Sequence, residues 1–396
     1  MALINLRNAM MAGKRLPYDA EVEYLESTGT QWIDTGVTPD FNLSMSATLC
    51  KTDTSVGFLF GARQANANNS FCLASFSTYA RFDFGGAGGN QGQTNISPIC
   101  DGNLHTISVA YPTITLDGAS NKMASVPSFS LNQNIVLFAN NTNGSITKYS
   151  GVRIAALKLY FNGVLVRDYI PVRKGTVGYL YDRVSGKLFG NAGTGDFVLG
   201  PDVVPVEWLG STGTQYIDSG VMLNSNHVVK LRGLRDSTTG GGYANSFFGA
   251  NIGFNVVFNL TGSVGVERFY FFESPSPKES QIATNTFKEY ECGKNFIIDG
   301  TPIGTTSSAT GSTTADAYIF ARNNGTAAKD FIRGKIAYLQ IWLNTDLVRD
   351  FIPVRVGTGS TWEGAMMDVL TRKVYRNQGT GAFTYGNDLK YPIPAE

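Results

Sequence analysis

Histidine is nearly absent from this chain of 396 residues. Its two histidines, His105 and His227, stand alone in separate halves of the sequence. A catalytic triad or a zinc site built on histidine needs that residue close to further functional groups in one domain. The sequence therefore predicts that each histidine is an isolated surface residue or is satisfied by its neighbours, and it predicts no catalytic residue.

Cysteine is also scarce and irregularly spaced. Cys50, Cys72 and Cys100 lie in the first half and Cys292 in the second, and no pair has CxxC spacing. Zinc sites and redox motifs normally show close pairs of cysteines. Free, buried thiols in a chain that folds in a reducing cytoplasm are the favoured interpretation.

Charge and long apolar runs are limited too. The formal net charge is +1 and only 16% of residues are charged, which gives no sign of a nucleic-acid partner. No run of about 18 apolar residues predicts a membrane span. The start of the chain does not resemble a signal peptide, because Asn5, Arg7 and Asn8 interrupt its apolar stretch and Lys14 and Arg15 come late.

What the chain does contain is a long internal repeat. VEYLESTGTQWIDTGV at 22–37 returns as VEWLGSTGTQYIDSGV at 206–221. The same order continues with DYIPVR at 168–173 and DFIPVR at 350–355, then NAGTGDFVLG at 191–200 and NQGTGAFTYG at 377–386. Solenoids repeat every 20 to 50 residues or so, whereas this unit is long enough to bury its own core. A whole domain has been duplicated.

The repeat sets the predicted domain boundaries. We expect an N-terminal anchoring arm at 1–18, a first lectin-like sandwich at 19–200, a second at 204–387 and a C-terminal tail at 388–396, with Pro201–Pro205 as a short, stiff joint.

Local patterns favour strands throughout. RIAALKLY at 153–160 and KIAYLQIW at 335–342 alternate in polarity with a period of two. Asn162-Gly163, Asp117-Gly118 and Asp299-Gly300 are typical of tight hairpins. The prediction is all-β: two tandem antiparallel β-sandwiches of the jelly-roll type, with Trp32 equivalent to Tyr216 and Tyr160 to Trp342.

LESTGTQWIDTGV, the D-aromatic-IPVR segments and LYDRVSGKLFGNAGTGDF at 180–197 together resemble the concanavalin A-like, laminin-G-like sandwich domains common in proteins of gut bacteria and their phages. The second copy departs from this pattern at 367–372, where it reads MDVLTR. The resemblance implies the fold. It also implies a structural protein of a phage as the context.

We interpret the motifs that both copies share mainly as residues of the structural framework, with a ligand-contacting loop as the alternative. A binding function is therefore expected where the copies differ. The segment 63–95 is rich in amides and aromatic residues and is predicted to be loop. Amides hydrogen-bond to sugar hydroxyls and rings stack on sugars, so this segment is a candidate for glycan contact; a plain solvated loop is the alternative. The candidate contact residues are Asn66, Asn68, Asn69, Tyr79 and Arg81.

Two chemical alternatives are weighed against glycan binding. Glu21, Glu23 and Glu26 resemble the E-x-D-x-x-E signature of glycoside hydrolases with this fold, but the second copy keeps only one of the three acids. Calcium at the rim of a sandwich is a second possibility. No acidic cluster repeats in a way that fixes its ligands, so no cofactor is predicted.

The arm at 1–18 has no counterpart before the second copy. Its apolar residues share one side of a short predicted helix that Gly13 and Pro17 would end. Docking on a larger assembly is predicted, and a local or disordered tail is the alternative. Several arms together would hold better than one, so a homo-oligomer, with a trimer as the first guess, is expected. The predicted anchoring residues are Leu3, Ile4, Met10, Met11, Lys14 and Arg15.

The resulting hypothesis is a non-enzymatic surface protein of a phage virion, as a capsid decoration, head fibre or tail-associated protein. It would contact other virion proteins through its arm, after assembly in the host cytoplasm, and display two lectin-like domains toward surface glycans. A bacterial glycan-binding adhesion module and a diverged glycoside hydrolase are the alternatives.

Overall fold

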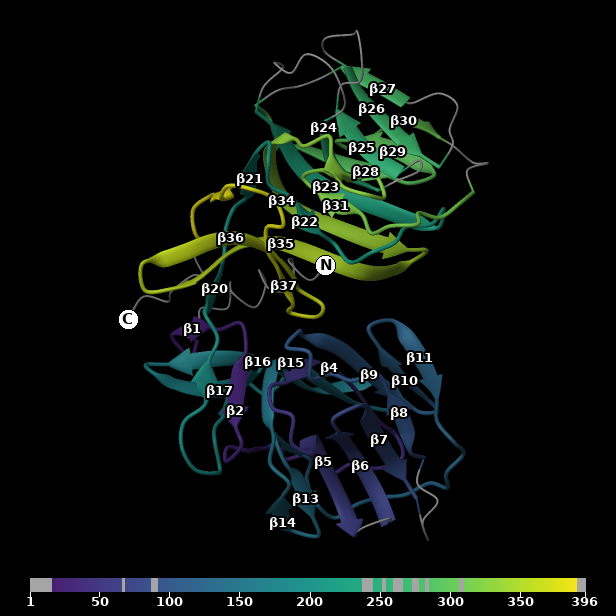
Figure 1. Ribbon diagram of the computed structural model, residues 1–396. Helices are drawn as coiled ribbons and strands as arrows, with labels where there is room; N and C mark the ends of the chain where they lie inside the picture. Colours follow the sequence, from purple (N-terminus) through teal and green to yellow (C-terminus); the bar gives the residue numbers. More distant parts are fainter. Residues whose placement is uncertain are drawn as a thin grey trace. The chain divides into compact units, whose positions relative to one another are not determined.

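The structure is a computed structural model that describes residues 16–65, 68–86, 92–236, 245–250, 254–258, 266–272, 278–281, 285–305 and 310–389. Two compact units divide the chain between Asp202 and Val203. Over the described ranges the secondary structure is β throughout (Figure 1). None of these residues belongs to a helix long and apolar enough to cross a bilayer.

The first unit is a sandwich of two sheets, here called the first sandwich. Its strands are Ala20–Glu21 (β1), Leu25–Thr28 (β2), Ile33–Asp34 (β3), Leu43–Lys51 (β4), Gly57–Ala65 (β5), Asn68–Ser75 (β6), Ala80–Gly85 (β7), Thr94–Ile96 (β8), His105–Ala110 (β9), Thr113–Leu116 (β10), Ala119–Lys122 (β11), Val136–Leu137 (β12), Asn140–Thr142 (β13), Ser145–Thr147 (β14), Gly151–Phe161 (β15), Val164–Lys174 (β16), Val177–Asp182 (β17), Lys187–Phe189 (β18) and Val198–Leu199 (β19).

The second unit, the second sandwich, has strands Asp202–Pro205 (β20), Leu209–Thr212 (β21), Ile217–Asp218 (β22), His227–Arg235 (β23), Asn245–Ala250 (β24), Phe254–Phe258 (β25), Val266–Phe271 (β26), Lys278–Gln281 (β27), Lys288–Cys292 (β28), Asn295–Ile298 (β29), Thr301–Thr305 (β30), Tyr318–Ile319 (β31), Arg322–Asn323 (β32), Ala328–Lys329 (β33), Arg333–Leu343 (β34), Asp346–Thr358 (β35), Thr361–Asp368 (β36), Val374–Tyr375 (β37) and Thr384–Tyr385 (β38).

The two sandwiches have the same topology. In the first, one sheet has the order β11-β10-β9-β4-β15-β16-β17-β18 and the other β14-β13-β5-β6-β7-β8. In the second, the larger sheet has the order β30-β29-β28-β23-β34-β35-β36-β37, which matches strand for strand. Pairing is antiparallel except where β13 meets β5 and β32 meets β24. Each unit is a jelly-roll sandwich of the concanavalin A-like, laminin-G-like type, as predicted.

Irregularities of register are duplicated along with the strands. The β15–β16 pairing shifts between Leu159 and Tyr160, and the β34–β35 pairing shifts between Ile341 and Trp342. This places Tyr160 and Trp342 at equivalent positions, as predicted. A β-bulge is a specific local feature, so its recurrence supports duplication of a whole domain.

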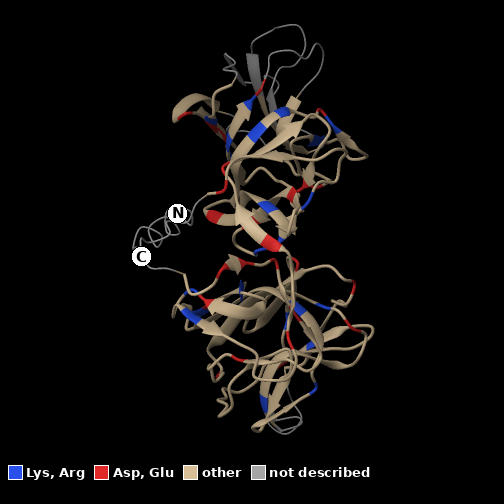
Figure 2. Ribbon diagram, turned by 90° about the vertical axis from the view of Figure 1, so that its left-hand side faces the viewer, with Lys and Arg blue, Asp and Glu red and all other residues tan. Residues whose placement is uncertain are grey.

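Alternation of side chains builds the core of each sandwich. In β4 the side chains of Leu43, Met45, Ala47 and Leu49 are all buried and face the other sheet. Fully burying a side chain of leucine or methionine stabilises the fold by roughly 1.5 to 3 kcal/mol. Figure 2 shows that charged residues are thinly spread along the ribbon, most of which is tan.

The predicted hairpin signals are confirmed by the backbone. Asn162 and Gly163 have φ of 48° and 76°, and they join β15 to β16. Asp117 and Gly118, between β10 and β11, have φ of 47° and 88°. Asparagine, aspartate and glycine tolerate this left-handed region better than other residues, which is why these dipeptides occupy the turns.

The predicted joint at Pro201–Pro205 is not a free linker. Asp202–Pro205 forms β20, which pairs with β35. A segment that hydrogen-bonds to a sheet edge is ordered by that sheet, so proline stiffness is not what holds it.

Candidate functional site

The repeated STGTQ motif is a hydrogen-bonded turn that fastens a distant loop. The side chain of Gln31 is 2% exposed, and its Oε1 accepts hydrogen bonds from the Thr28 amide (2.9 Å) and the Ser27 hydroxyl (3.1 Å). Its Nε2 donates to the carbonyl of Asp196 at 2.9 Å. In the second sandwich Gln215 repeats these bonds. Buried polar groups must be paired, so this glutamine serves the fold.

The NAGTG loop that meets this turn needs glycine where the two segments touch. A Cβ at Gly193 would lie 2.1 Å from the carbonyl oxygen of Thr30, and one at Gly379 would lie 2.1 Å from that of Thr214. The backbone of Trp32 also donates to the Asn191 side chain at 3.1 Å. Tyr216 makes the equivalent bond to Asn377, which confirms that Trp32 and Tyr216 are equivalent.

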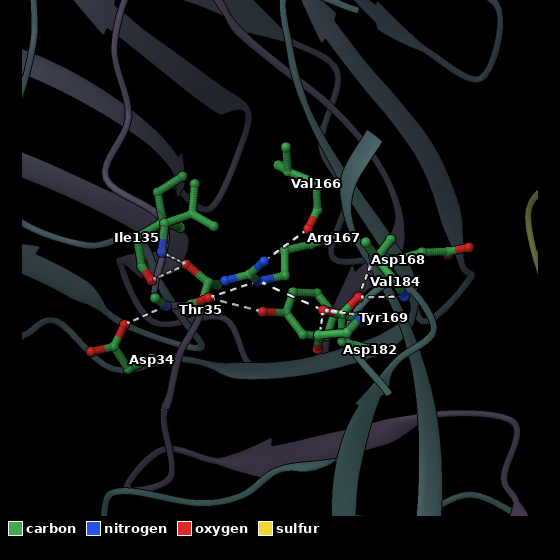
Figure 3. Close-up of polar contacts among 12 residues, drawn as sticks. Asp34, Thr35, Ile135, Val166, Arg167, Asp168, Tyr169, Asp182 and Val184 are labelled. Atoms are coloured by element: carbon green, nitrogen blue, oxygen red, sulfur yellow. Dashed lines mark hydrogen bonds and ion pairs between the residues drawn. The ribbon is translucent and has the colours of Figure 1, made fainter. Parts of the chain in front are cut away.

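The D-aromatic-IPVR motif belongs to a second polar cluster (Figure 3). Arg167 Nε and the Tyr169 hydroxyl both donate to the carbonyl of Thr35, at 3.2 and 3.0 Å. The fully buried carboxylate of Asp182 lies 3.8 Å from Arg167 Nε and accepts a hydrogen bond from the Asp168 amide at 2.8 Å. Burial, the first cause, raises the pKa of Tyr169 well above its usual value.

The second sandwich keeps this cluster with one replacement. Arg349 Nε lies 3.9 Å from Asp368, whose Oδ1 accepts from the amide of Asp350 at 3.0 Å. Phe351 stands in the place of Tyr169, without a hydroxyl group. The polar side chains that the copies share are therefore used by the fold, and a binding surface has to be sought among the residues that differ.

One surface that differs is the outer face of β5, β6 and β7, which we call the arginine–aromatic face. Phe71, Leu73, Phe82 and Phe84 point into the main core. Their neighbours along the strands point the other way. The arginine–aromatic face has five half-buried residues, Arg63, Phe76, Tyr79, Arg81 and Thr142, which lie over a buried layer of Phe58, Cys72, Ala74, Asp83 and Asn140.

One end of this face carries a guanidinium group between a carboxylate and stacked rings. Arg81 Nε lies 2.8 Å from Asp83 Oδ1, and the guanidinium carbon lies 5.2 Å from the centre of the Phe76 ring. The rings of Phe76 and Tyr79 stack with centroids 4.6 Å apart and 17° between their planes. Burial raises the pKa of Asp83, and Arg81 counteracts that effect.

Arg63 occupies the other end of the face. Its Nε donates to the Thr142 hydroxyl at 3.0 Å, and its guanidinium carbon lies 5.1 Å from the centre of the Phe58 ring. Thr142 also accepts from Asn140 Nδ2 at 2.8 Å. Arg63 is half-buried, so its charged group is held in place and still reaches the surface.

Cys72, between the two arginines, is not a reactive thiol. It is fully buried, and burial raises the pKa of its thiol well above the usual value. Its Sγ lies 3.9 Å from Asp83 Oδ2. A thiol acts as nucleophile or metal ligand only when deprotonated, so Cys72 contributes packing to this face.

The corresponding face of the second sandwich has a different composition. In the first sandwich Cys72 pairs with Gly61 of β5 and with Asp83 of β7. At the equivalent positions of the second sandwich, Asn255 pairs with Gly249 and with Tyr270. Among the residues whose side chains are described, Phe58 and Asp83 thus have Ser246 and Tyr270 at the equivalent positions of the second copy. The fold does not require phenylalanine or aspartate at these two positions.

The predicted glycan loop needs correction. Most of the segment 63–95 is sheet, since it contains β6, β7 and parts of β5 and β8. Asn69, the second residue of β6, donates to Gln64, whereas Tyr79 and Arg81 follow the far end of that strand. Eight residues of strand span roughly 26 Å, so these residues do not form one compact site.

Of the remaining predicted contact residues, Asn68 is the first residue of β6, and Asn66 lies outside the described residues. The composition of the segment hid a pattern with a period of two, namely Phe71 and Leu73, then Phe82 and Phe84. That pattern was the available signal for strands, and it marks Asp83 as an outward residue beside Arg81. It does not mark Phe58, because the register shifts between Phe58 and Phe60. Sequence reasoning also missed Arg63 and Phe76.

All six predicted anchoring residues of the arm, Leu3, Ile4, Met10, Met11, Lys14 and Arg15, also lie outside the described residues. The placement of the arm, and the partners predicted for it, stay predictions.

Both histidines are satisfied by neighbours, as predicted. His105 lies between two carboxylates, with Nδ1 2.6 Å from Asp117 Oδ2 and Nε2 2.9 Å from Asp101 Oδ1. The hydrogen bond to Asp117 is the main reason that the pKa of His105 is raised. His227 Nδ1 accepts a hydrogen bond from the Asn224 amide at 2.9 Å.

The acidic triplet near the start of the first sandwich is divided between strands. Glu21 lies in β1, and Glu26 lies in β2, where its Oε2 is 2.7 Å from Arg153 Nε. Glu23 is buried and falls between the two strands. Within the described ranges, no group of three or more His, Cys, Asp or Glu side chains is placed to hold a metal ion.

Comparison with known proteins gives matches only among solved structures. No protein-family model and no curated protein matches the chain. The mouse laminin alpha1 chain domains LG4-5 match with 12% identity and a TM-score of 0.31, over 85% of this chain and 92% of that one. The K499G mutant of NanB sialidase from Streptococcus pneumoniae matches with 9% identity and a TM-score of 0.26, over 91% and 75%.

The binding domain of Paraclostridial Mosquitocidal Protein 1 also matches, with 9% identity and a TM-score of 0.26, over 95% of this chain and 94% of that one. At such TM-scores these likenesses say nothing about ligand or reaction. Function has to be argued from the residues themselves.

Proposed function

We propose that this chain is a non-enzymatic, glycan-binding module, and that the arginine–aromatic face of the first sandwich is its contact surface. The observation that carries the proposal is the combination on one sheet face of two ring-supported guanidinium groups and a stacked Phe76–Tyr79 pair. At the described equivalent positions the second copy has Ser246 and Tyr270 in place of Phe58 and Asp83, so folding alone does not explain these residues.

The chemistry of the face suits a saccharide. Aromatic rings pack against the apolar faces of sugars, and guanidinium groups donate hydrogen bonds to sugar hydroxyls with fixed geometry. Arg63 and Arg81 are each held by a ring and by a hydrogen-bonded neighbour, so little side-chain entropy is lost on binding. Such a face favours weak, reversible contact, which several copies in one assembly would strengthen.

The groups on the face are poorly suited to catalysis. The carboxylate of Asp83 is paired with Arg81, and the thiol of Cys72 is buried and protonated. Glycoside hydrolysis uses two carboxyl groups that flank one bond, whereas this face carries a single acidic residue. These features support a binding role.

For the setting of the module we propose the surface of a phage particle, with residues 1–18 as the attachment segment. The support is the resemblance of the repeated motifs to phage structural domains and the apolar stripe of the segment. Deleting 1–17 is expected to abolish incorporation into particles and to leave the melting of both sandwiches unchanged. Normal incorporation of the truncated protein would overturn this part. Light scattering of the full chain tests for the expected homo-oligomer.

The binding proposal is tested on a glycan array with the full chain, alongside Tyr79→Ala and the control Val164→Ala. Both side chains lie outside the main core, and Val164 is 66% exposed at the β15–β16 hairpin. Loss of a stacking ring is expected to weaken binding about three- to tenfold, since aromatic stacking contributes about 0.5 to 1.5 kcal/mol. The control is expected to bind normally.

Absence of binding to every glycan, or equal binding by both variants, would contradict the proposal. Hydrolysis of a bound glycan would contradict the non-enzymatic part alone.

A further inference from the structure

We infer that the saccharide recognised at the arginine–aromatic face is acidic, and that its carboxylate binds Arg63. This inference rests on the proposed function. It adds the chemical class of the ligand and the residue that selects it.

The first observation is a charge imbalance on this part of the sheet. Between Gly57 and Ile99 the sequence contains two basic residues, Arg63 and Arg81, and one acidic residue, Asp83. Asp83 is mainly committed to Arg81, because both of its oxygens lie within 3.2 Å of Arg81 nitrogens, and Arg63 acts on it as a weaker, more distant charge. The neighbouring segments 66–67 and 87–91 contain no acidic residue that could neutralise Arg63.

The second observation sets Arg63 apart from the other described arginines of the first sandwich. Each of those has a carboxylate within 4 Å: Asp83 for Arg81, Glu26 for Arg153, Asp182 for Arg167, Asp202 for Arg173 and Asp168 for Arg183. Among the described residues, the hydroxyl of Thr142 is the group that accepts a hydrogen bond from Arg63. The other described arginines of this domain are paired with carboxylates of the protein. Arg63 has none within 4 Å, so its guanidinium group is suited to binding an external anion.

The geometry of Arg63 favours a carboxylate. Its Nε is occupied by Thr142, and stacking on Phe58 fixes the plane of the guanidinium group. The two terminal nitrogens remain for a pair of parallel hydrogen bonds, which is how arginine recognises planar carboxylates. Partial burial lowers the local dielectric constant and strengthens such a pair.

The aromatic stack lies toward the same part of the face as the charged group of Arg63. The Arg63 guanidinium lies over the ring of Phe58, and Phe58 opposes Ala74 of β6, as Arg81 does. We therefore expect the acidic unit bound by Arg63 to lie beside the Phe76–Tyr79 stack.

The test uses a panel of oligosaccharides that contain uronic or sialic acids, printed beside their carboxyl-reduced and sulfated counterparts. The full chain is compared with Arg63→Gln and with a variant that removes one charge elsewhere. The second variant is Lys187→Gln, because Lys187 is exposed in β18 of the other sheet of the same sandwich, so its variant removes the same charge away from the face. Circular dichroism melting of each variant checks that it folds.

We expect a carboxylated glycan to bind at least tenfold more tightly than its reduced form. Arg63→Gln should abolish that preference and Lys187→Gln should retain it. Sodium chloride should weaken the binding of the acidic ligand selectively. Equal binding of acidic and reduced forms, preference for the sulfated form, or an unchanged preference in Arg63→Gln would overturn the inference and leave glycan binding standing. If no glycan in the panel or on the wider array binds, the proposed function fails as well.

Discussion

Replacing Gln31 by leucine is expected to destabilise the first sandwich selectively. Leucine keeps the approximate volume but removes the acceptor for the Thr28 amide and the donor to the Asp196 carbonyl. Each buried group left without a partner costs about 1 to 3 kcal/mol. We therefore expect a loss of about 2 to 4 kcal/mol. With a urea dependence of about 2 to 3 kcal/mol per molar, the midpoint should fall by roughly 1 M.

The readout must separate the two sandwiches, so unfolding in urea is followed by pulsed hydrogen exchange and mass spectrometry of peptides from each. Gln133→Leu is the matched control, because the hydrogen bonds of Gln133 in the same sandwich, with the Asn143 side chain and the Asn132 amide, are exposed. Gln215→Leu should produce the same loss in the second sandwich. A shift for Gln31→Leu below about 0.5 kcal/mol, or equal to that of Gln133→Leu, would refute the idea that this motif fastens the fold.

Three further changes have expected outcomes. Gly193→Ala should lower the stability of the first sandwich by about 1 to 3 kcal/mol in urea unfolding, because the added methyl group meets the Thr30 carbonyl; an unchanged midpoint would contradict the close contact. Asp182→Ala should cost about 3 to 5 kcal/mol in the same assay, since it leaves Arg167 without its carboxylate and the buried Asp168 amide without its acceptor; a loss under 1 kcal/mol would contradict this. His105→Gln should destabilise the first sandwich most between about pH 4.5 and 6. A difference in unfolding free energy between the variant and the original chain that stays constant from pH 5 to pH 9 would contradict a charged His105.

The pH window of the His105 variant follows from the signs of the pKa shifts. The pKa of His105 is raised above 6.5, so its stabilising effect is complete below that value and is lost as the pH rises through the folded-state pKa. Partial burial would raise the pKa of Asp101, but hydrogen bonds from Asn103 and His105 lower it to about 2. The effect of that carboxylate is therefore present above about pH 4 and lost on acidification.

The sequence was sufficient to predict the fold because a duplicated chain supplies its own comparison. Residues kept in both copies, such as Gln31 and Gln215 or Gly193 and Gly379, are those whose polar groups or close contacts the sandwich requires. Alternation of side chains and turn dipeptides then indicated strands and hairpins. These signals are local, so they can be read without a structure.

The candidate face could not be predicted in the same way. Its residues come from three neighbouring strands and from β13, and they converge only when β5, β6 and β7 pair in one register. The high content of amides between 63 and 95 suggested a loop and hid the alternation of Phe82 and Phe84. The pairing of Arg63 with Thr142 joins positions far apart in the chain, and no local pattern announces it.

The most direct test of the arginine–aromatic face is covalent mapping of a bound glycan. An array hit that carries a photoreactive diazirine is bound to the full chain, irradiated, and the crosslinked peptides are identified by mass spectrometry. We predict crosslinks within residues 58–83, concentrated near Arg63 and the Phe76–Tyr79 stack, and their loss with excess unlabelled glycan. Competed crosslinks confined to the second sandwich, or to the β15–β16 hairpin of the first, would contradict the assignment of this face as the binding surface.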